Sequence, residues 1–250
     1  MAAASAPSTG IRGCHLVGSV PFSDAETVFR ESARRMPNRL PRIPDGETNE
    51  RNYFTVWQFA GFKDATLAIN PIIYNQAARD TDFTAAEIQD GIAQVRNLNL
   101  ETRYDEVAME NYKTFKRLRD EEGVIPKGTK FQVCLPTGAS VVICLHHQFR
   151  EAGFEVYEAA LFRAMRKMQD AIPHEDLSIQ IDLAVDTAFW EGVYEKPWFE
   201  NPKETTVEYI VRMISQVDPD VEVGLHNCYG KLSKKNYYLR THHLLIFFDQ

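Results

Sequence analysis

A histidine and a cysteine stand two residues apart in the stretch LHNC, which follows an apolar run late in the chain. These residues are His226 and Cys228. Imidazole and thiolate groups are preferred ligands of Zn²⁺, and a catalytic zinc site normally combines three protein ligands with an open position for water or substrate. The spacing therefore predicts a zinc site at the end of a strand, with two of its protein ligands identified.

Further ligands for this site are scarce in the sequence. Cys14 and His15 are neighbours in an apolar run, where strand alternation would point only one of them inward. His242 and His243 lie downstream, but no feature of that segment fixes their position. We therefore expect an incomplete zinc site that retains metal weakly. The alternative interpretation is a buried histidine and a free cysteine that bind no metal.

Polar side chains also end other predicted strands. Ser19, Glu47 and Asp182 each follow a short apolar run, as His226 does. The carboxyl ends of parallel barrel strands converge on one face, where barrel enzymes perform their chemistry. We therefore predict that these four residues line one cleft. Taken singly, each has a simpler explanation, since Ser19 suits a turn and Asp182 suits the cap of a following segment.

Strand and helix signals alternate along the chain. Predicted strands cover about residues 15–19, 42–46, 131–135, 178–182 and 221–226, and predicted helices begin after Ser23 and Thr84 and cover about 105–122, 156–172 and 206–217. Ser23 with Glu26, and Thr84 with Glu87, have the spacing of capping boxes. Such a series of βα units predicts an α/β protein with a mostly parallel sheet, either a barrel or an open doubly wound sheet.

Composition limits the class of protein and its partners. A chain of 250 residues with 44% hydrophobic content can bury one domain-sized core. The net charge of -7 disfavours nucleic acid and anionic membranes as partners and leaves small or neutral molecules. The sequence shows neither a signal peptide nor an apolar run of membrane-spanning length, which predicts a cytoplasmic protein. Its 4 cysteines form no CxxC pair, as expected for free thiols in a reducing compartment.

Four motifs, in this order, resemble the uroporphyrinogen decarboxylase/cobalamin-independent methionine synthase superfamily, and most closely its small single-domain members. HLVGSVP resembles the GSxP strand of that family, PDGETNERNYF its GE and ERN segment, SIQID its IQID strand, and LHNC its HxC zinc pair. The similarity spans roughly residues 14–230. It implies a TIM-type (β/α)8 barrel.

The resemblance also implies an activity, which is zinc-dependent methyl or alkyl transfer to a thiol. His226 and Cys228 match the metal ligands of the synthase branch, where zinc keeps a bound thiol as its thiolate. Ser19, Glu47 and Asp182 match the residues that bind the amino-acid part of the thiol substrate, and the two carboxylates are the expected catalytic groups. A pair of carboxylates suits an ammonium group.

The sequence departs from the family at two places. The synthases follow IQID with Glu-Pro, whereas this chain has Leu183 and Ala184, which puts folate binding in doubt. The remaining metal ligands of the family, a Glu and a Cys, lie on later strands, and the sequence predicts only about five of the eight barrel strands. We therefore expect a disordered segment at 1–13, a partial barrel at 14–230 and a divergent basic and apolar tail at 231–250.

An incomplete barrel exposes two sheet edges, so a further copy or chain that covers them is an expected partner. Within the tail, LLIFF is either a buried strand or an unpaired apolar end. Two functional alternatives also remain open. One is a non-catalytic truncated remnant or assembly subunit, and the other is a decarboxylase or lyase-type member of the superfamily that acts in secondary metabolism.

Overall fold

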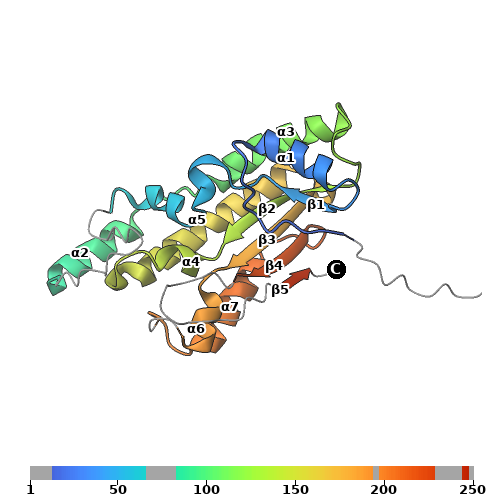
Figure 1. Cartoon of the computed structure of the whole chain (residues 1–250). Helices are drawn as coiled ribbons and strands as arrows, with labels where there is room; N and C mark the ends of the chain where they lie inside the picture. The colour runs from blue at the N-terminus through green and yellow to red at the C-terminus, as the bar shows by residue number, and fades with distance from the viewer. Residues whose placement is uncertain (1–12, 66–82, 194–196, 229–243, 248–250) are drawn as a thin grey trace, which may run out of the picture.

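A five-stranded sheet, in the order β1-β2-β3-β4-β5, organises the computed structural model, which describes residues 13–65, 83–193, 197–228 and 244–247, the last four by their backbone alone. The strands are β1 (Arg42–Pro44), β2 (Lys130–Pro136), β3 (Leu177–Leu183), β4 (Glu222–Asn227) and β5 (Leu244–Phe247). β1 to β4 are parallel, and β5 pairs antiparallel with β4 (Figure 1). The predicted α/β class and four of the predicted strands are confirmed. Of the two alternatives for LLIFF, the structure shows a paired strand.

The prediction of a strand at 15–19 is wrong. The structure assigns no strand to residues 13–22. Gly18 adopts a φ of 135°, a conformation that favours glycine and interrupts an extended run. Only two backbone hydrogen bonds join this segment to the chain around β1: Cys14 N donates to Arg39 O at 2.7 Å, and Val20 N donates to Gly46 O at 3.0 Å.

The helices of the described residues are α1 (Ala25–Arg35), α2 (Ala85–Arg96), α3 (Tyr104–Asp120), α4 (Gly138–Val142), α5 (Arg150–Ala171), α6 (Asp186–Glu191) and α7 (Pro202–Ile214), with short 3-10 turns at Asn49–Asn52, Val56–Phe62, His147–Phe149 and His174–Asp176. The five predicted helices are present among them, but α1 precedes the first strand, and two helices, α2 and α3, lie between β1 and β2. The sequence predicted neither α4 nor α6, because five or six residues show too little of a helical period.

The two predicted helix caps differ in outcome. The capping box of Thr84 and Glu87 is confirmed, because each side chain binds the backbone N–H of the other residue. At α1 the predicted cap is wrong by one residue. Asp24 accepts from Thr27 N at 2.8 Å, and Ser23 instead donates its hydroxyl to Asp24. A carboxylate satisfies the same unpaired N–H groups and also favours the positive end of the helix dipole.

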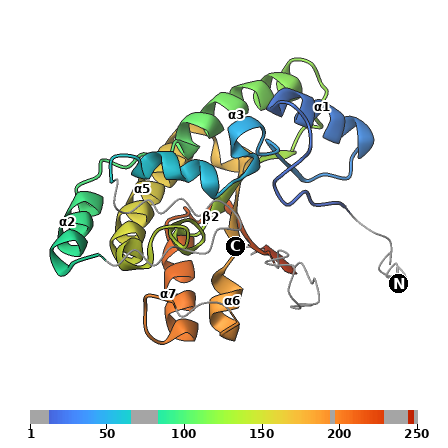
Figure 2. The same ribbon diagram turned by 60° about the vertical axis from the view of Figure 1, so that its left-hand side comes forward.

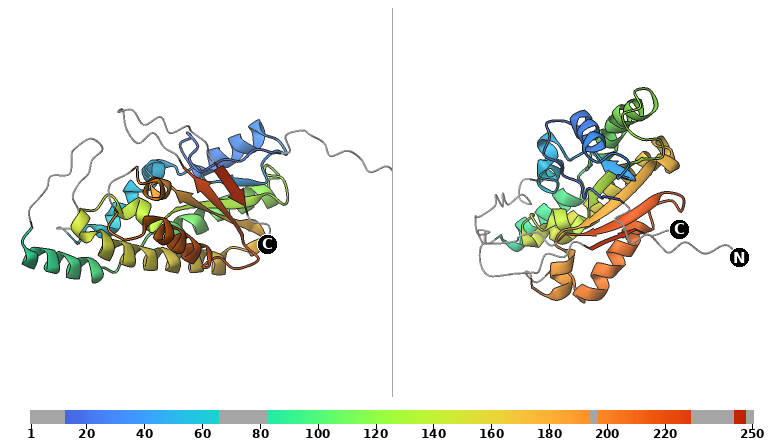
Figure 3. Two further views of the ribbon diagram at one scale, coloured as in Figure 1. Left: turned by 90° about the horizontal axis from the view of Figure 1, so that it is seen from below. Right: turned by 45° about the vertical axis from the view of Figure 1, so that its right-hand side comes forward.

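The two faces of the sheet differ in chemistry. One face packs against α1, α3, α5 and α7 and forms the main hydrophobic core, where Phe131, Ile179 and Val223 from β2, β3 and β4 are at most 1% exposed. Figure 3 shows α5 and α7 together along one side of the strands. Phe29 and Phe115 meet Phe131 in this layer, with ring centroids 5.4 to 6.1 Å apart.

The opposite face of the sheet is polar. Because side chains alternate along a strand, this face presents Arg42, Gln132, Cys134, Ser178, Gln180, Asp182, Glu222 and His226. Residues 13–22 cross this face (Figure 1). The carbonyl oxygens of Leu16 and Val17 accept hydrogen bonds from the side-chain amides of Gln132 and Gln180, at 2.9 and 2.8 Å. These side chains on the sheet therefore take the place of a strand neighbour for the 13–22 segment.

Some predictions fall outside the described residues. The expected disordered start lies there except for Gly13, and so does the expected tail except for the four residues of β5. No helix in the described ranges has the length and apolar character needed to cross a membrane.

In Figure 2 the four helices α1, α3, α5 and α7 follow the sheet from one edge to the other, so the hydrophobic core is continuous along the sheet.

Candidate functional site

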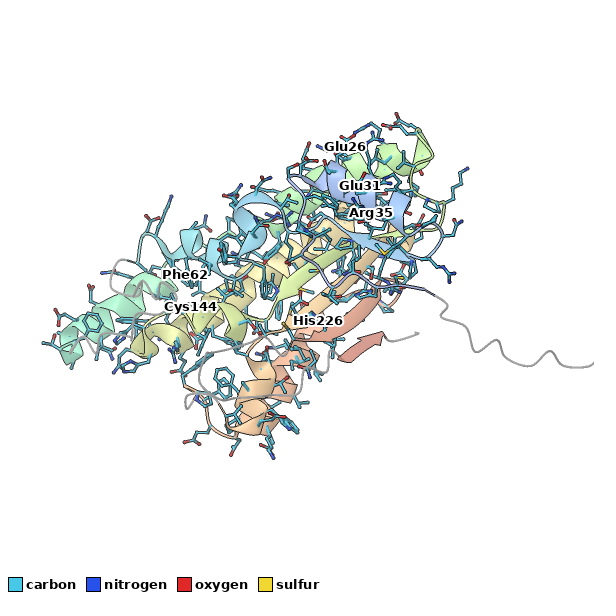
Figure 4. All side chains as sticks on the ribbon, viewed as in Figure 1. Glu26, Glu31, Arg35, Phe62, Cys144 and His226 are labelled. Carbon is cyan, nitrogen blue, oxygen red and sulfur yellow. The ribbon has the colours of Figure 1, made fainter. Side chains whose placement is uncertain are left out.

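A pocket of ≈ 180 Å³ lies at the carboxyl ends of the parallel strands. Its lining residues are Val17, Ser19, Glu47, Phe54, Asp182, His226 and Cys228. All five residues that the sequence predicted as site residues are among them, so the structure brings them together around one pocket. Figure 4 marks His226 at the end of β4, over the polar face of the sheet. The roles of these residues stay predictions.

Strand register brings Asp182 and His226 together. They are direct partners in the pairing of β3 with β4, so both side chains project from the same face. His226 Nδ1 lies 2.7 Å from Asp182 Oδ1, and both residues are buried. Cys228 N donates to Leu183 O at 3.1 Å, which extends the pairing beyond β4. Cys228 therefore follows His226 on the same side of the sheet.

The two oxygens of Asp182 have different surroundings. Oδ1 accepts a hydrogen bond from Gln180 Nε2 at 2.8 Å and is also hydrogen-bonded to His226 Nδ1. Oδ2 has no hydrogen-bond partner among the described residues. Oδ2 is not among the described buried polar atoms that lack a partner, so it is open to the pocket, where it can accept a hydrogen bond from a donor group on a ligand.

Glu47 is held in the pocket by an unusual backbone conformation. Its φ is 50°, in the left-handed region that residues other than glycine seldom adopt. Its N–H donates to Asp45 Oδ1 at 3.0 Å, and Asp45 is itself fixed by Arg51 at 2.9 Å and Asn111 at 2.8 Å. Strain of this kind costs about 1 to 3 kcal/mol and is concentrated at functional sites.

The carboxylate of Glu47 has one partner in the described residues. Ser19 Oγ donates to Oε2, and Oε1 accepts no hydrogen bond there. Gly18 packs against this carboxylate, because a Cβ at that position would lie 3.3 Å from its atoms. The GSxP and GE motifs therefore meet in space: the first supplies the hydroxyl donor, and the second supplies the carboxylate that accepts its hydrogen bond.

Burial dominates the electrostatics of the pocket. It raises the pKa of Glu47 to about 7, and the nearby carboxylates of Asp182 and Asp45 add to this rise, whereas the Ser19 hydrogen bond and the Arg51 charge oppose it. Burial also raises the pKa of Asp182, and the interactions with His226 and Gln180 oppose that rise. The pocket can therefore take up or release a proton near neutral pH, at Glu47.

The donor set partly fits zinc. His226 is hydrogen-bonded through Nδ1 to a carboxylate, as in zinc sites where a second carboxylate orients the histidine and Nε2 binds the metal. The thiol of Cys228, a ligand type that zinc prefers, lines the same pocket. Among the described residues, no group of three His, Cys, Asp or Glu side chains has the arrangement of a metal site. These residues thus provide two ligands.

Of the other histidines and cysteines considered from the sequence, Cys14 and His15 do not line this pocket. Cys14 is exposed, and His15 Nε2 bonds to Gln180 Oε1 at 2.8 Å on the polar face. His242 and His243 lie outside the described residues. Sequence reasoning missed Val17 and Phe54, which form the apolar part of the pocket wall. Val17 belongs to the HLVGSVP motif and Phe54 to the PDGETNERNYF motif, and membership of these motifs was the only signal in the sequence that they lie near the site.

The fold and the pocket define an α/β protein whose parallel sheet has, at its carboxyl edge, a small pocket that combines ionisable and apolar side chains. Comparison of the chain with protein-family models, with curated proteins and with solved structures found no match. The likeness of the four motifs to a superfamily therefore stays a prediction from sequence.

Proposed function

We propose that the pocket binds a small amino-acid thiol and that the protein transfers a methyl or alkyl group to its sulfur with the help of Zn²⁺. One observation carries this proposal. The groups suited to an ammonium ion, Glu47 and Asp182, line the same pocket as His226 and Cys228, the groups suited to zinc. Each set alone has a simpler explanation, but together they match the two ends of an amino-acid thiol.

The carboxylates account for recognition of the ammonium end. Asp182 Oδ2 and Glu47 Oε1 each lack a hydrogen-bond donor within the described residues. An ammonium group has three N–H donors and forms its strongest hydrogen bonds with carboxylates. The pocket of ≈ 180 Å³ also suits an amino acid better than a pterin, since pockets for drug-sized ligands span about 300 to 1,000 Å³.

The histidine and the cysteine account for the thiol end. His226 would hold the metal through Nε2 and Cys228 through Sγ, while Asp182 keeps the imidazole ring in place. When bound, zinc supplies a Lewis acid that keeps a substrate thiol in its thiolate form at neutral pH. The proton released from the thiol passes to water, because Glu47 must stay ionised to bind the ammonium group.

The transfer itself needs an alkyl donor whose methyl carbon is bound to a leaving heteroatom, such as a sulfonium. The electron pair of the substrate sulfur forms the new carbon–sulfur bond, and the bond from carbon to the heteroatom breaks with its electron pair retained by the donor. Val17 and Phe54 make the apolar wall of the pocket beside which this exchange would take place.

We further propose that the four parallel strands are part of a barrel wall. Helices α1, α3, α5 and α7 all pack on one face of the sheet, and the other face is polar and holds the pocket. In a doubly wound sheet helices cover both faces, whereas in a barrel they cover the outer face and the site lies at the carboxyl ends of the strands.

A second candidate function is binding of the same ligand without catalysis. One observation favours it, namely that the described residues provide only two zinc ligands where catalytic sites normally have three. In that case the protein would bind the amino-acid thiol and transfer nothing when a sulfonium methyl donor is added.

The test combines metal analysis with calorimetry of ligand binding. We expect substoichiometric zinc that dialysis removes, and retention that improves when homocysteine is present. Cys228→Ser should lose both effects. Cys144→Ser is the matched control, because Cys144 is also a partly buried free cysteine but lies outside the pocket. Homoserine and N-acetylhomocysteine should bind at least about tenfold more weakly, since each lacks one of the two recognised groups. Equal affinity for all three compounds would contradict the proposal.

A further inference from the structure

We infer that Gln180 is a positioning residue that fixes the tautomer of His226 through Asp182. Gln180 is fully buried in β3, two residues before Asp182, and does not line the pocket. Its proposed effect is to keep the proton of the imidazole on Nδ1, so that Nε2 presents its lone pair. The consequence for zinc rests on the proposed function, but the consequence for the tautomer does not.

The orientation of the Gln180 amide is fixed by its neighbours. Its nitrogen lies 2.8 Å from Val17 O, which can only accept a hydrogen bond, so Nε2 must be the donor there. Nε2 also donates to Asp182 Oδ1 at 2.8 Å. On the other side, Oε1 accepts from Gln132 Nε2 at 3.2 Å and from His15 Nε2 at 2.8 Å. A flipped amide would place carbonyl against carbonyl, so only one orientation satisfies all four contacts.

This orientation determines where the proton between Asp182 and His226 lies. Asp182 Oδ1 already accepts an N–H from Gln180, which disfavours a proton on that oxygen. The hydrogen bond at 2.7 Å between Oδ1 and Nδ1 then requires His226 to be the donor. Without Gln180, Oδ1 could hold a proton and donate it to Nδ1, and the ring proton would move to Nε2. Both residues are buried, so water has little access to replace the lost donor.

On the side of Gln180 that faces away from Asp182, a chain of contacts runs through His15 and Arg42 to Glu222. Arg42 binds Glu222 at 2.5 Å, and its Nη1 lies 3.5 Å from Nδ1 of His15. Because a guanidinium can only donate, Nδ1 of His15 is the acceptor and Nε2 carries the hydrogen that Gln180 receives. His15, which the sequence offered as a zinc ligand, therefore acts two contacts away from the pocket.

The experiment reads the tautomer directly. In protein labelled with ¹⁵N at histidine, the ring nitrogen chemical shifts of His226 distinguish the two tautomers at one fixed, slightly alkaline pH. We expect Nδ1–H in the wild type and a mixture or the Nε2–H form in Gln180→Met, which keeps the size of the side chain but removes its donor. Zinc affinity, measured by competition with a chelator, should fall by about 10- to 100-fold in the same variant.

Ser178→Ala is the matched control. Ser178 lies on the same strand and face, is equally buried, and binds Glu222 at 2.8 Å instead of the pocket residues. It should change neither the tautomer nor the zinc affinity. If Gln180→Met lowers stability but leaves His226 as Nδ1–H, Gln180 is merely structural and the inference is wrong.

Two further outcomes separate the inference from the proposed function. A wild-type protein with His226 as Nε2–H would overturn the inference without any variant, and this measurement holds even if Gln180→Met does not fold. A wild-type protein that binds no zinc while His226 is Nδ1–H would refute the proposed function and leave the positioning role intact.

Discussion

Asp182 and His226 are in-register partners on adjacent parallel strands, and Nδ1 of the imidazole lies 2.7 Å from Oδ1 of the carboxylate. Both residues belong to strands, so their relative position is set by the backbone hydrogen bonds of the sheet and not by a loop. A pair held in this way can be altered one atom at a time without displacing the backbone that carries it.

Asp182→Asn should remove ammonium binding while leaving His226 in place. Asparagine keeps an Oδ1 that can accept from His226 and Gln180, but its NH₂ group replaces Oδ2, the oxygen that faces the ligand. A lost hydrogen bond to a charged group is worth about 1.5 to 3 kcal/mol, so the affinity for homocysteine should fall by about 10- to 100-fold. Calorimetry measures the affinity, and histidine ring shifts check that the tautomer is retained.

Asp186→Asn is the control for this change. Asp186 is also a fully buried aspartate, but it binds Thr137 and Ser140 away from the pocket. It should leave homocysteine binding unchanged. A similar loss of affinity in both variants would mean that any buried aspartate substitution disturbs the site through the fold.

Glu47→Gln should stabilise the protein, and only at high pH. Burial raises the pKa of Glu47 from 4.5 to about 7, so between these values the folded state binds a proton that the unfolded state has released. Wild-type stability therefore falls as pH rises from 4.5 to about 7 and stays low above that range. A shift of this size corresponds to about 3 kcal/mol. Urea unfolding should show Glu47→Gln more stable by about that amount at pH ~8, with the gain disappearing below pH ~4.5. A gain that is constant with pH would contradict the assigned cause.

Ser19→Ala should shift the pH dependence of ligand binding. The Ser19 hydroxyl donates to Glu47 and stabilises its charged form, so its removal raises the pKa of Glu47 further. Because an ammonium ligand needs the ionised carboxylate, the midpoint of binding should move upward by about one pH unit. Ser23→Ala, which removes a similar hydroxyl from exposed Asp24, should leave the midpoint unchanged. If the wild type and Ser19→Ala had the same pH midpoint of ligand binding, Ser19 would have no influence on the group that titrates.

Gly18→Ala should lower both stability and ligand affinity. A side chain at a φ of 135° is strained, and its methyl group would press on the Glu47 carboxylate at 3.3 Å. We expect a cost of about 1 to 3 kcal/mol in urea unfolding, together with weaker homocysteine binding. Gly123→Ala introduces left-handed strain at a φ of 65°, where a Cβ meets nothing within 4 Å. It should lower stability by about 1 kcal/mol and leave the affinity unchanged. Equal affinities in the two variants would show that Gly18 does not shape the pocket.

The fold was predictable where local pattern and tertiary burial agree. Apolar runs bounded by turn residues located β2, β3 and β4, because strands covered by helices need apolar side chains there. The same kind of apolar run led to the wrong prediction of a strand at 15–19. An apolar run does not reveal whether its carbonyls are bound by a neighbouring strand or by side chains, and here Gln132 and Gln180 bind Leu16 and Val17.

The site was predictable in part for a similar reason. Glu47, Asp182 and His226 were found because polar residues after apolar runs mark strand ends, and parallel strands end on one side of a sheet. Ser19 was expected in the site from a strand that the structure does not contain, and it reaches the pocket from the segment that crosses the polar face. Gln180 was not singled out, although it lies inside the IQID motif. Its signal is a polar residue in the middle of a buried strand, which becomes informative only when the partners of its amide are known.

The side-chain contacts that hold residues 13–22 on the polar face have a consequence for the order of folding. Leu16 binds Gln132 across 116 residues of sequence, and Val17 binds Gln180 across 163. Contacts of such separation close large loops and form late, after the apolar layer between the helices and β2, β3 and β4 has collapsed. Substitutions in the N-terminal segment should therefore accelerate unfolding and hardly change the folding rate, which corresponds to φ-values near zero. The pocket, which takes Ser19 and Val17 from this segment, would then be assembled in the last step of folding.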